Sequence, residues 1–212
     1  MKTYTRGGTG EIQTREGSHT YPGNPWPAGR FPKQISLGDG SSVLLRRLEH
    51  GDEGSLLAFF QAIPEGERFF LKDDVTSPAV IRHWFANQER AFGLVAVDSG
   101  RIVAEAALVR RRGQARAHLA DARMVVAKEW RNCGLGTALL SALCDVARDS
   151  GLNGVLCEAV EDKQAEALAA ADSLGFVRLG RIYGGAIDPK GCLHDVILLV
   201  MPLRRWRRAS EY

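Results

Sequence analysis

The chain has 212 residues, 45% of them hydrophobic, and a formal net charge of +3. This composition suits one well-buried core, and the length is that of a single domain. The small positive charge matches an anionic ligand but is too weak to indicate nucleic acid as a partner. No apolar run reaches membrane-spanning length, so we expect no membrane segment and a cytoplasmic protein.

The first 32 residues are rich in glycine and proline and poor in aliphatic side chains. Such a segment buries too little surface to order itself, so we expect residues 1–32 to form a flexible arm, with Tyr21, Trp26 and Phe31 as the side chains that could lay it on the domain. A hairpin follows, because two apolar stretches flank Gly38-Asp39-Gly40. Helices are predicted at 52–62 and from Ser77-Pro78, where a capping residue precedes proline.

Strands and helices then alternate along the second half of the chain. The predicted elements are strands at 92–97, 101–109 and 117–126, a helix from 135 to about 150, a strand at 154–160, a helix at 163–174, and strands at 177–183 and 193–201. This order predicts an α/β fold with a mixed, mostly antiparallel sheet of about seven strands and helices on both faces. The basic run at 204–212 is interpreted as a solvated tail.

Two glycines one residue apart open the long helix, in the run Arg131-Asn132-Cys133-Gly134-Leu135-Gly136-Thr137. An apolar strand precedes this run, so the pattern is strand, tight turn and helix. Glycine lets the backbone approach a ligand, and the N–H groups of a first helical turn favour an anion. A Walker loop would need lysine after the last glycine, and a dinucleotide fingerprint would need glycine or alanine where Leu139 stands.

The run has the form R-x-x-G-x-G, and in this it resembles the acyl-coenzyme A pyrophosphate loop of the GNAT superfamily of N-acetyltransferases. The flanking strand and helix are similar to the family's core, and Leu174-Gly175-Phe176 resembles its later Leu-Gly-Phe turn. The similarity covers roughly residues 33–203, which we therefore expect to form a GNAT acetyltransferase domain. Parts of the N-terminal half resemble bacterial members, including the protein-lysine acetyltransferase branch.

The resemblance implies a function, a cofactor and a set of contacts. The function is transfer of an acetyl group from acetyl-CoA to a primary amine, on a protein or a small molecule, by direct attack in a ternary complex. Backbone groups of Met124, Val125 and Val126 would bind the pantetheine arm and the developing oxyanion. The run from Arg131 to Thr137 would hold the pyrophosphate. The family needs no acyl-enzyme, so Cys133 is not expected to act as a nucleophile, and a homodimer is possible.

Three carboxylates are candidates for the general base. Glu158 is the first, because ribosomal-protein N-acetyltransferases of this family carry a catalytic glutamate at that place, and because an ionisable residue in an apolar strand needs a reason. Its alternative is a carboxylate at a sheet edge that pairs with an arginine. Asp121 is the second candidate, and Glu105 on the neighbouring strand is the third.

The sequence departs from the family where many members carry a tyrosine that protonates the leaving thiolate. That position, five residues before Phe176, is Ala171 here. Either the thiolate leaves unaided, or Tyr183 or water supplies the proton; free thiols have a pKa near ~8.5, which makes unaided departure tolerable. The alternative function is a catalytically weak acyl-CoA sensor or interaction module. The four cysteines show no metal-binding spacing, so no metal is expected.

Overall fold

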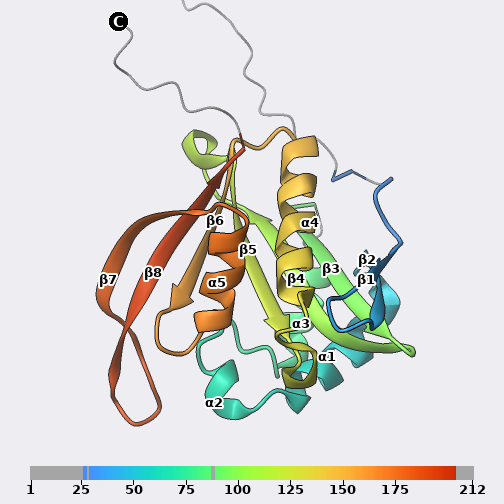
Figure 1. Ribbon diagram of the computed structural model, residues 1–212, viewed down its shortest axis with the longest axis horizontal. Helices are drawn as coiled ribbons and strands as arrows, with labels where there is room; N and C mark the ends of the chain where they lie inside the picture. The colour runs from blue at the N-terminus through green and yellow to red at the C-terminus, as the bar shows by residue number, and fades with distance from the viewer. Residues whose placement is uncertain (1–25, 28, 87–88, 204–212) are drawn as a thin grey trace, which may run out of the picture.

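The computed structural model describes residues 26–27, 29–86 and 89–203 and shows a central sheet with helices on both faces (Figure 1). The strands are β1 (Lys33–Ser36), β2 (Ser42–Arg47), β3 (Ala91–Asp98), β4 (Arg101–Arg110), β5 (Leu119–Val126), β6 (Gly154–Val160), β7 (Val177–Ile187) and β8 (Leu193–Pro202). The helices are α1 (Glu53–Ala62), α2 (Glu65–Arg68), α3 (Pro78–Ala86), α4 (Leu135–Asp149) and α5 (Ala165–Ser173), with short 3-10 turns at His50–Asp52, Gln114–Arg116 and Lys128–Trp130.

The sheet has the order β1-β2-β3-β4-β5-β6-β8-β7. Only β5 and β6 run parallel, and every other neighbouring pair is antiparallel. The expected mixed, mostly antiparallel architecture is therefore confirmed. The described residues form eight strands, in agreement with the expected sheet of about seven, and the predicted hairpin is β1 paired with β2 at the edge of the sheet.

Strand alternation divides the apolar residues between two cores. On β3, Leu94 packs with α4 and α5 on one face, whereas its neighbour Val95 packs with α1 and α3 on the other. Figure 1 shows α4 and α5 together on the near face of the sheet. Leu135, Leu139 and Leu143 recur every four residues along α4, so all three point into the first core and are fully buried.

The start of α3 follows its sequence signal. Ser77 precedes Pro78, and the carbonyl of Ser77 accepts the N–H groups of Val80 and Ile81 at 3.1 and 3.2 Å.

Helix α2 was missed by sequence reasoning. Its four residues are too few for a periodic pattern, so the only hint of this helix was the proline at its start. Of the helices that the structure describes, none has the length and apolar character needed to cross a bilayer.

The segment expected to be an arm is described only from Trp26 onward; its first 25 residues, like the tail at 204–212, lie outside the described residues. Trp26 is buried in the first core, and its ring centroid lies 5.8 Å from that of Phe92. Phe31 packs against the same core. Trp26 and Phe31 therefore pack the end of this segment against the domain.

Candidate functional site

The two parallel strands at the centre of the sheet separate soon after they pair. β5 and β6 are in register only from Leu119 to Asp121, opposite Gly154 to Leu156. Beyond this point β6 continues to pair with β8, and β5 continues to pair with β4. A gap therefore opens in the sheet beside the second half of β5.

Backbone groups of β5 alternate between this gap and β4. Ala127 donates its N–H to the carbonyl of Val103 at 2.9 Å, which sets the phase of the ladder. In an antiparallel ladder alternate residues turn both backbone groups to the same neighbour. Val125 consequently faces β4, whereas Met124 and Val126 direct their N–H and C=O groups toward the gap. Of the three residues expected to bind pantetheine, Met124 and Val126 turn their backbone groups to the gap and Val125 does not.

The glycine loop lies between the end of β5 and the start of α4. Asn132 has a φ of 60° and Gly134 a φ of 92°, both in the left-handed region, which turns the chain sharply into the helix. A Cβ added at Gly134 would meet nothing within 4 Å, so the space in front of the loop is open. The first turn of α4 has N–H groups without intrahelical acceptors, at Leu135, Gly136 and Thr137. Open space, unpaired donors and the helix dipole together fit a phosphate group.

Neighbouring contacts hold this loop in position. The carbonyl of Cys133 accepts the N–H of Gly38 at 2.9 Å, and the Cys133 thiol donates to the carbonyl of Trp130 at 3.0 Å. The thiol is buried and turned back toward its own chain, as expected for a residue with no nucleophilic role. Arg131 donates from Nε to the carbonyl of Val126 at 3.0 Å and pairs through Nη2 with Glu67 of α2.

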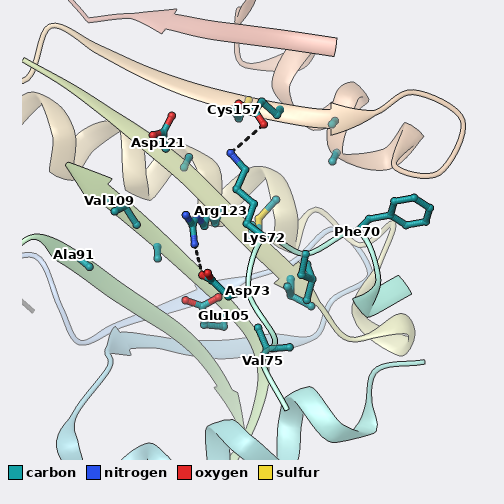
Figure 2. A pocket seen from close by; sticks show the side chains of 18 of the residues that line it. Phe70, Lys72, Asp73, Val75, Ala91, Glu105, Val109, Asp121, Arg123 and Cys157 are labelled. Atoms are coloured by element: carbon teal, nitrogen blue, oxygen red, sulfur yellow. Dashed lines mark hydrogen bonds and ion pairs between the residues drawn. The ribbon is translucent and has the colours of Figure 1, made fainter. Parts of the chain in front are cut away.

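A cavity of about 1060 Å³ lies on the α1 and α3 face of the sheet, next to the gap. Figure 2 shows side chains from β4, β5, β6 and the segment after α2 converging on it. All three carboxylates proposed from the sequence, Glu105, Asp121 and Glu158, line this one cavity. Met124 and Cys157 line it where it meets the gap. The three candidates come from three strands, and the twist and splay of the sheet bring them together.

Glu105 is the most buried of the three, with 3% of its surface exposed. Removal from water raises the pKa of its carboxyl group to about 8, an effect that the positive charge of Arg123 partly opposes. No lysine or arginine among the described residues lies within ion-pair distance of it. Glu105 is thus a carboxyl group that exchanges a proton near neutral pH inside a cavity.

The other two carboxylates are held by cations. Asp121 accepts hydrogen bonds from Nε of Arg111 at 3.0 and 3.1 Å and from Nη2 at 2.8 Å. Glu158 forms an ion pair with Nζ of Lys72 at 3.0 Å, and both side chains are partly exposed. A carboxylate held by a bidentate arginine is fixed in place, which suits a role in positioning.

A segment that sequence reasoning missed crosses the gap. We call residues 67–73 the bridging segment, because three of its residues form ion pairs with three different parts of the site. Glu67 pairs with Arg131 of the loop, Lys72 pairs with Glu158 of β6, and Asp73 pairs with Arg123 of β5 at 2.5 Å. Figure 2 shows Lys72 and Asp73 side by side on this segment, with Asp73 directed to Arg123. The sequence held no signal for these pairs, because their members are 50 or more positions apart.

The structure also locates the two residues discussed as sources of a proton. Ala171 lies in the first core with 1% of its surface exposed, so α5 presents no titratable group there. Tyr183 on β7 is 81% exposed and is not among the residues that line the cavity. The ring of Tyr183 instead lies 5.8 Å from the guanidinium carbon of Arg181. Tyr183 is therefore not positioned to protonate a group in the gap.

Comparison with known proteins agrees with this geometry. Residues 58–176 match the model of the acetyltransferase (GNAT) family. Over 118 residues the chain is 28% identical to N-alpha-acetyltransferase 30 of Schizosaccharomyces pombe. The matched stretch is 53% of this chain and 77% of that protein.

Solved structures share the fold. The GNAT domain of S. lividans PAT superposes with a TM-score of 0.68 at 18% identity, covering 83% of this chain and 99% of that one. The yncA protein of Salmonella typhimurium, solved with its cofactor acetyl-CoA, gives 0.68 at 17% identity over 80% of this chain and 99% of that one. Ribosomal-protein-alanine N-acetyltransferase from Brucella melitensis gives 0.66 at 22% identity, with 75% and 99% covered.

Proposed function

Because this chain belongs to the acetyltransferase (GNAT) family and is an N-acetyltransferase, we propose that it transfers the acetyl group of acetyl-CoA to a primary amine by direct attack in a ternary complex. The observation that carries this proposal is the cavity that joins the gap beside β5 to the buried carboxyl group of Glu105. One end of this space suits a thioester, and the other suits an amine with a base beside it.

The donor site consists of the gap and the glycine loop. Acetyl-CoA supplies an activated acetyl thioester and a pyrophosphate anchor. The N–H groups from Leu135 to Thr137 would donate to the pyrophosphate at the start of α4. Backbone groups of Met124 and Val126 would bind the pantetheine arm, and an N–H there would stabilise negative charge on the carbonyl oxygen.

Glu105 is the general base in this proposal. An ammonium group must lose a proton before its nitrogen can attack, and the best base has a pKa near the working pH. The pKa of Glu105 is raised to about 8, and no cation holds its carboxylate. Holding amine and thioester together in the cavity then supplies much of the rate by positioning.

Asp121 and Glu158 take other roles. Asp121 fixes Arg111 at the wall of the cavity, and Glu158 fixes Lys72 of the bridging segment. This ranking differs from the one based on sequence, where Glu158 came first. The reason is that burial and ion pairing, which set the proton affinity of a carboxylate, depend on residues distant in the chain.

The alternative function, a weakly catalytic acyl-CoA sensor, is favoured by one observation, the core position of Ala171. Without a phenol the thiolate would leave unprotonated or receive its proton from water. A thiol pKa of ~8.5 makes the first route accessible, so slow but real turnover is expected rather than none.

Calorimetric titration with acetyl-CoA tests the donor site. Gly136→Val would place a side chain against Met124, between the gap and the first turn of α4, and should weaken binding at least tenfold, because the pyrophosphate could no longer approach that turn. Gly54→Val is the matched control, since Gly54 is an exposed helical glycine in α1 with nothing within 4 Å of an added Cβ. Equal binding by both variants would show that the loop does not hold the cofactor.

Release of free coenzyme A in the presence of a broad panel of amines and peptides tests the reaction. Glu105→Gln should lower turnover by about 100-fold or more, the usual effect of losing a general base. Asp121→Asn and Glu158→Gln should have smaller effects. If acetyl-CoA binds but no acceptor releases coenzyme A above background, the protein is a sensor rather than an enzyme.

A further inference from the structure

One end of the cavity carries an excess of positive charge. Three ion pairs balance within its wall: Lys72 with Glu158, Arg123 with Asp73, and Arg111 with Asp121. The remaining charged side chains in the lining include Arg90, Arg112 and Arg116, and opposite them only the carboxyl group of Glu105. Among the described residues, none of these three arginines has a carboxylate partner within ion-pair distance.

These arginines come from adjacent connections at the same end of the sheet. Arg90 lies just before β3 and donates from Nη2 to the carbonyl of Arg110 at 3.4 Å. Arg112 and Arg116 lie in the connection from β4 to β5 and are exposed at the rim of the cavity. We call Arg90, Arg112 and Arg116 the arginine rim. A cavity whose rim has one sign of charge raises the local concentration of ligands of the opposite sign.

The distance between the arginine rim and the base limits the kind of acceptor. The arginine rim adjoins Arg110, whose carbonyl accepts from Arg90. Glu105 and Arg110 are five residues apart on β4, which corresponds to ~17 Å along the strand. A single amino acid cannot reach both places. An extended polypeptide advances at most ~3.3–3.6 Å per residue, so its first five or six residues span this length. The geometry therefore favours a chain that enters amine first.

The chemistry of the base favours a particular amine. The α-amino group of a polypeptide has a pKa of ~7.7–8.0, whereas that of a lysine side chain is near ~10.4. Burial raises the pKa of Glu105 to about 8, so transfer of a proton from an α-ammonium group to it is nearly balanced. Transfer of a proton from a lysine ammonium group to Glu105 would be uphill, because the pKa of lysine is more than ~2 above that of Glu105.

We propose that the acceptor is the α-amino group of a polypeptide whose first six residues include Asp or Glu, and that the arginine rim recognises those side chains. The inference rests on the proposed function and adds its substrate class. The acidic side chains meet Arg112 and Arg116 at the rim, while the amine reaches Glu105. Peptides with basic residues at the same positions are repelled.

Three synthetic decapeptides test the inference. The first two share a free N-terminus and differ only at positions three to six, which are glutamate in one and arginine in the other. The third has a formylated N-terminus and a single internal lysine. The kcat/KM for release of coenzyme A is measured for each, and the acetylated position is found by mass spectrometry. We expect the acidic peptide to be preferred by about tenfold or more, with the acetyl group on its α-amine.

Charge reversal identifies the residues responsible. The double variant Arg112→Glu, Arg116→Glu should raise the KM of the acidic peptide about tenfold, leave its kcat nearly unchanged and improve the arginine peptide. Arg82→Glu, Arg101→Glu is the matched control, because both residues are exposed and neither lines the cavity. Unchanged binding of acetyl-CoA shows that each variant is folded.

The outcomes separate this inference from the function on which it rests. Equal rates for the acidic and basic peptides, acetylation of the internal lysine alone, or equal effects of the two double variants would each overturn it. Turnover with small amines but with no peptide would also overturn it, while leaving the acetyltransferase function intact. Absence of both acetyl-CoA binding and turnover would instead refute the proposed function.

Discussion

At the scale of single residues, the three cavity carboxylates differ mainly in what surrounds them. Asp121 and Glu158 each have a cation within 3.0 Å, whereas Glu105 is almost fully buried and has none within ion-pair distance among the described residues. Desolvation raises the pKa of the Glu105 carboxyl group. The surroundings of Glu105 therefore predict how the protein responds to pH.

The first prediction concerns stability against pH. The pKa of Glu105 is raised to about 8, from an unfolded value near ~4.3. Below that lower value both states are protonated and the neutral buried group is fully tolerated. As the pH rises toward 8 the unfolded chain has already released the proton, so the free energy of unfolding falls.

Glu105→Gln should remove this dependence. In urea unfolding the variant should gain on wild type as the pH rises from 5 to 9, and at pH 9 it should be more stable by ~2–5 kcal/mol. Asp121→Asn serves as the control and should not become more stable at high pH, because it removes the hydrogen bonds that Asp121 accepts from Arg111. Parallel pH curves for wild type and Glu105→Gln would mean that Glu105 is ionised throughout.

At the scale of elements, the bridging segment contacts both strands that border the gap, β5 and β6. Lys72 reaches β6 and Asp73 reaches β5, so this short connection spans the place where the two strands separate. Such partly exposed pairs contribute only ~0–1 kcal/mol each to stability. Their importance is electrostatic, because Arg123, the partner of Asp73, also acts on Glu105.

A second prediction follows for Asp73→Asn. This change leaves the charge of Arg123 unbalanced, and a stronger positive field favours ionised Glu105 and lowers its pKa further. The rising limb of kcat/KM against pH should therefore move to lower pH than in wild type. Comparing the two proteins with the same acceptor cancels the titration of the acceptor itself.

Lys72→Met is the matched control for that shift. It breaks the other ion pair of the bridging segment, with Glu158, and leaves Asp73 and Arg123 paired. The rising limb of kcat/KM against pH for Lys72→Met should lie at the same pH as in wild type. A shift of equal size in both variants would indicate loosening of the segment rather than an effect of charge on Glu105.

At the scale of the whole molecule, the sheet separates two apolar cores, and Trp26 and Phe31, which precede β1, pack in the first. Trp26 packs near Phe92, and the guanidinium carbon of Arg110 lies 4.2 Å from the centroid of its ring. These contacts hold the segment before β1 against the sheet. They also tie it to the end of β4, next to the arginine rim.

A third prediction concerns this anchor. Trp26→Ala should lower the free energy of unfolding by ~3–5 kcal/mol, the usual cost of truncating a buried aromatic residue. Trp26→Phe should cost less, because it keeps most of the ring and removes an indole N–H that has no hydrogen-bond partner among the described residues. Denaturant unfolding measures both. Equal small losses would show that the segment before β1 adds little to the core.

Local patterns determined a large part of this protein from sequence alone. The turn and helix from Arg131 to Thr137 could be predicted because φ preferences of glycine and the first turn of a helix depend on neighbouring residues only. The periodic leucines of α4 and the proline at the start of α3 are local in the same sense. The family resemblance rests on that run, and the three carboxylates could be named in advance.

The tertiary structure alone decided which of those residues act together and how. The raised pKa of Glu105 comes from burial on a sheet made of distant strands, and the partner of Arg131 lies 64 positions away in α2. The excess of arginine at one end of the cavity can be identified only when it is known which cations of the cavity wall are paired with carboxylates. Proton affinity and net local charge are sums over neighbours in space, and a sequence specifies those neighbours only by folding.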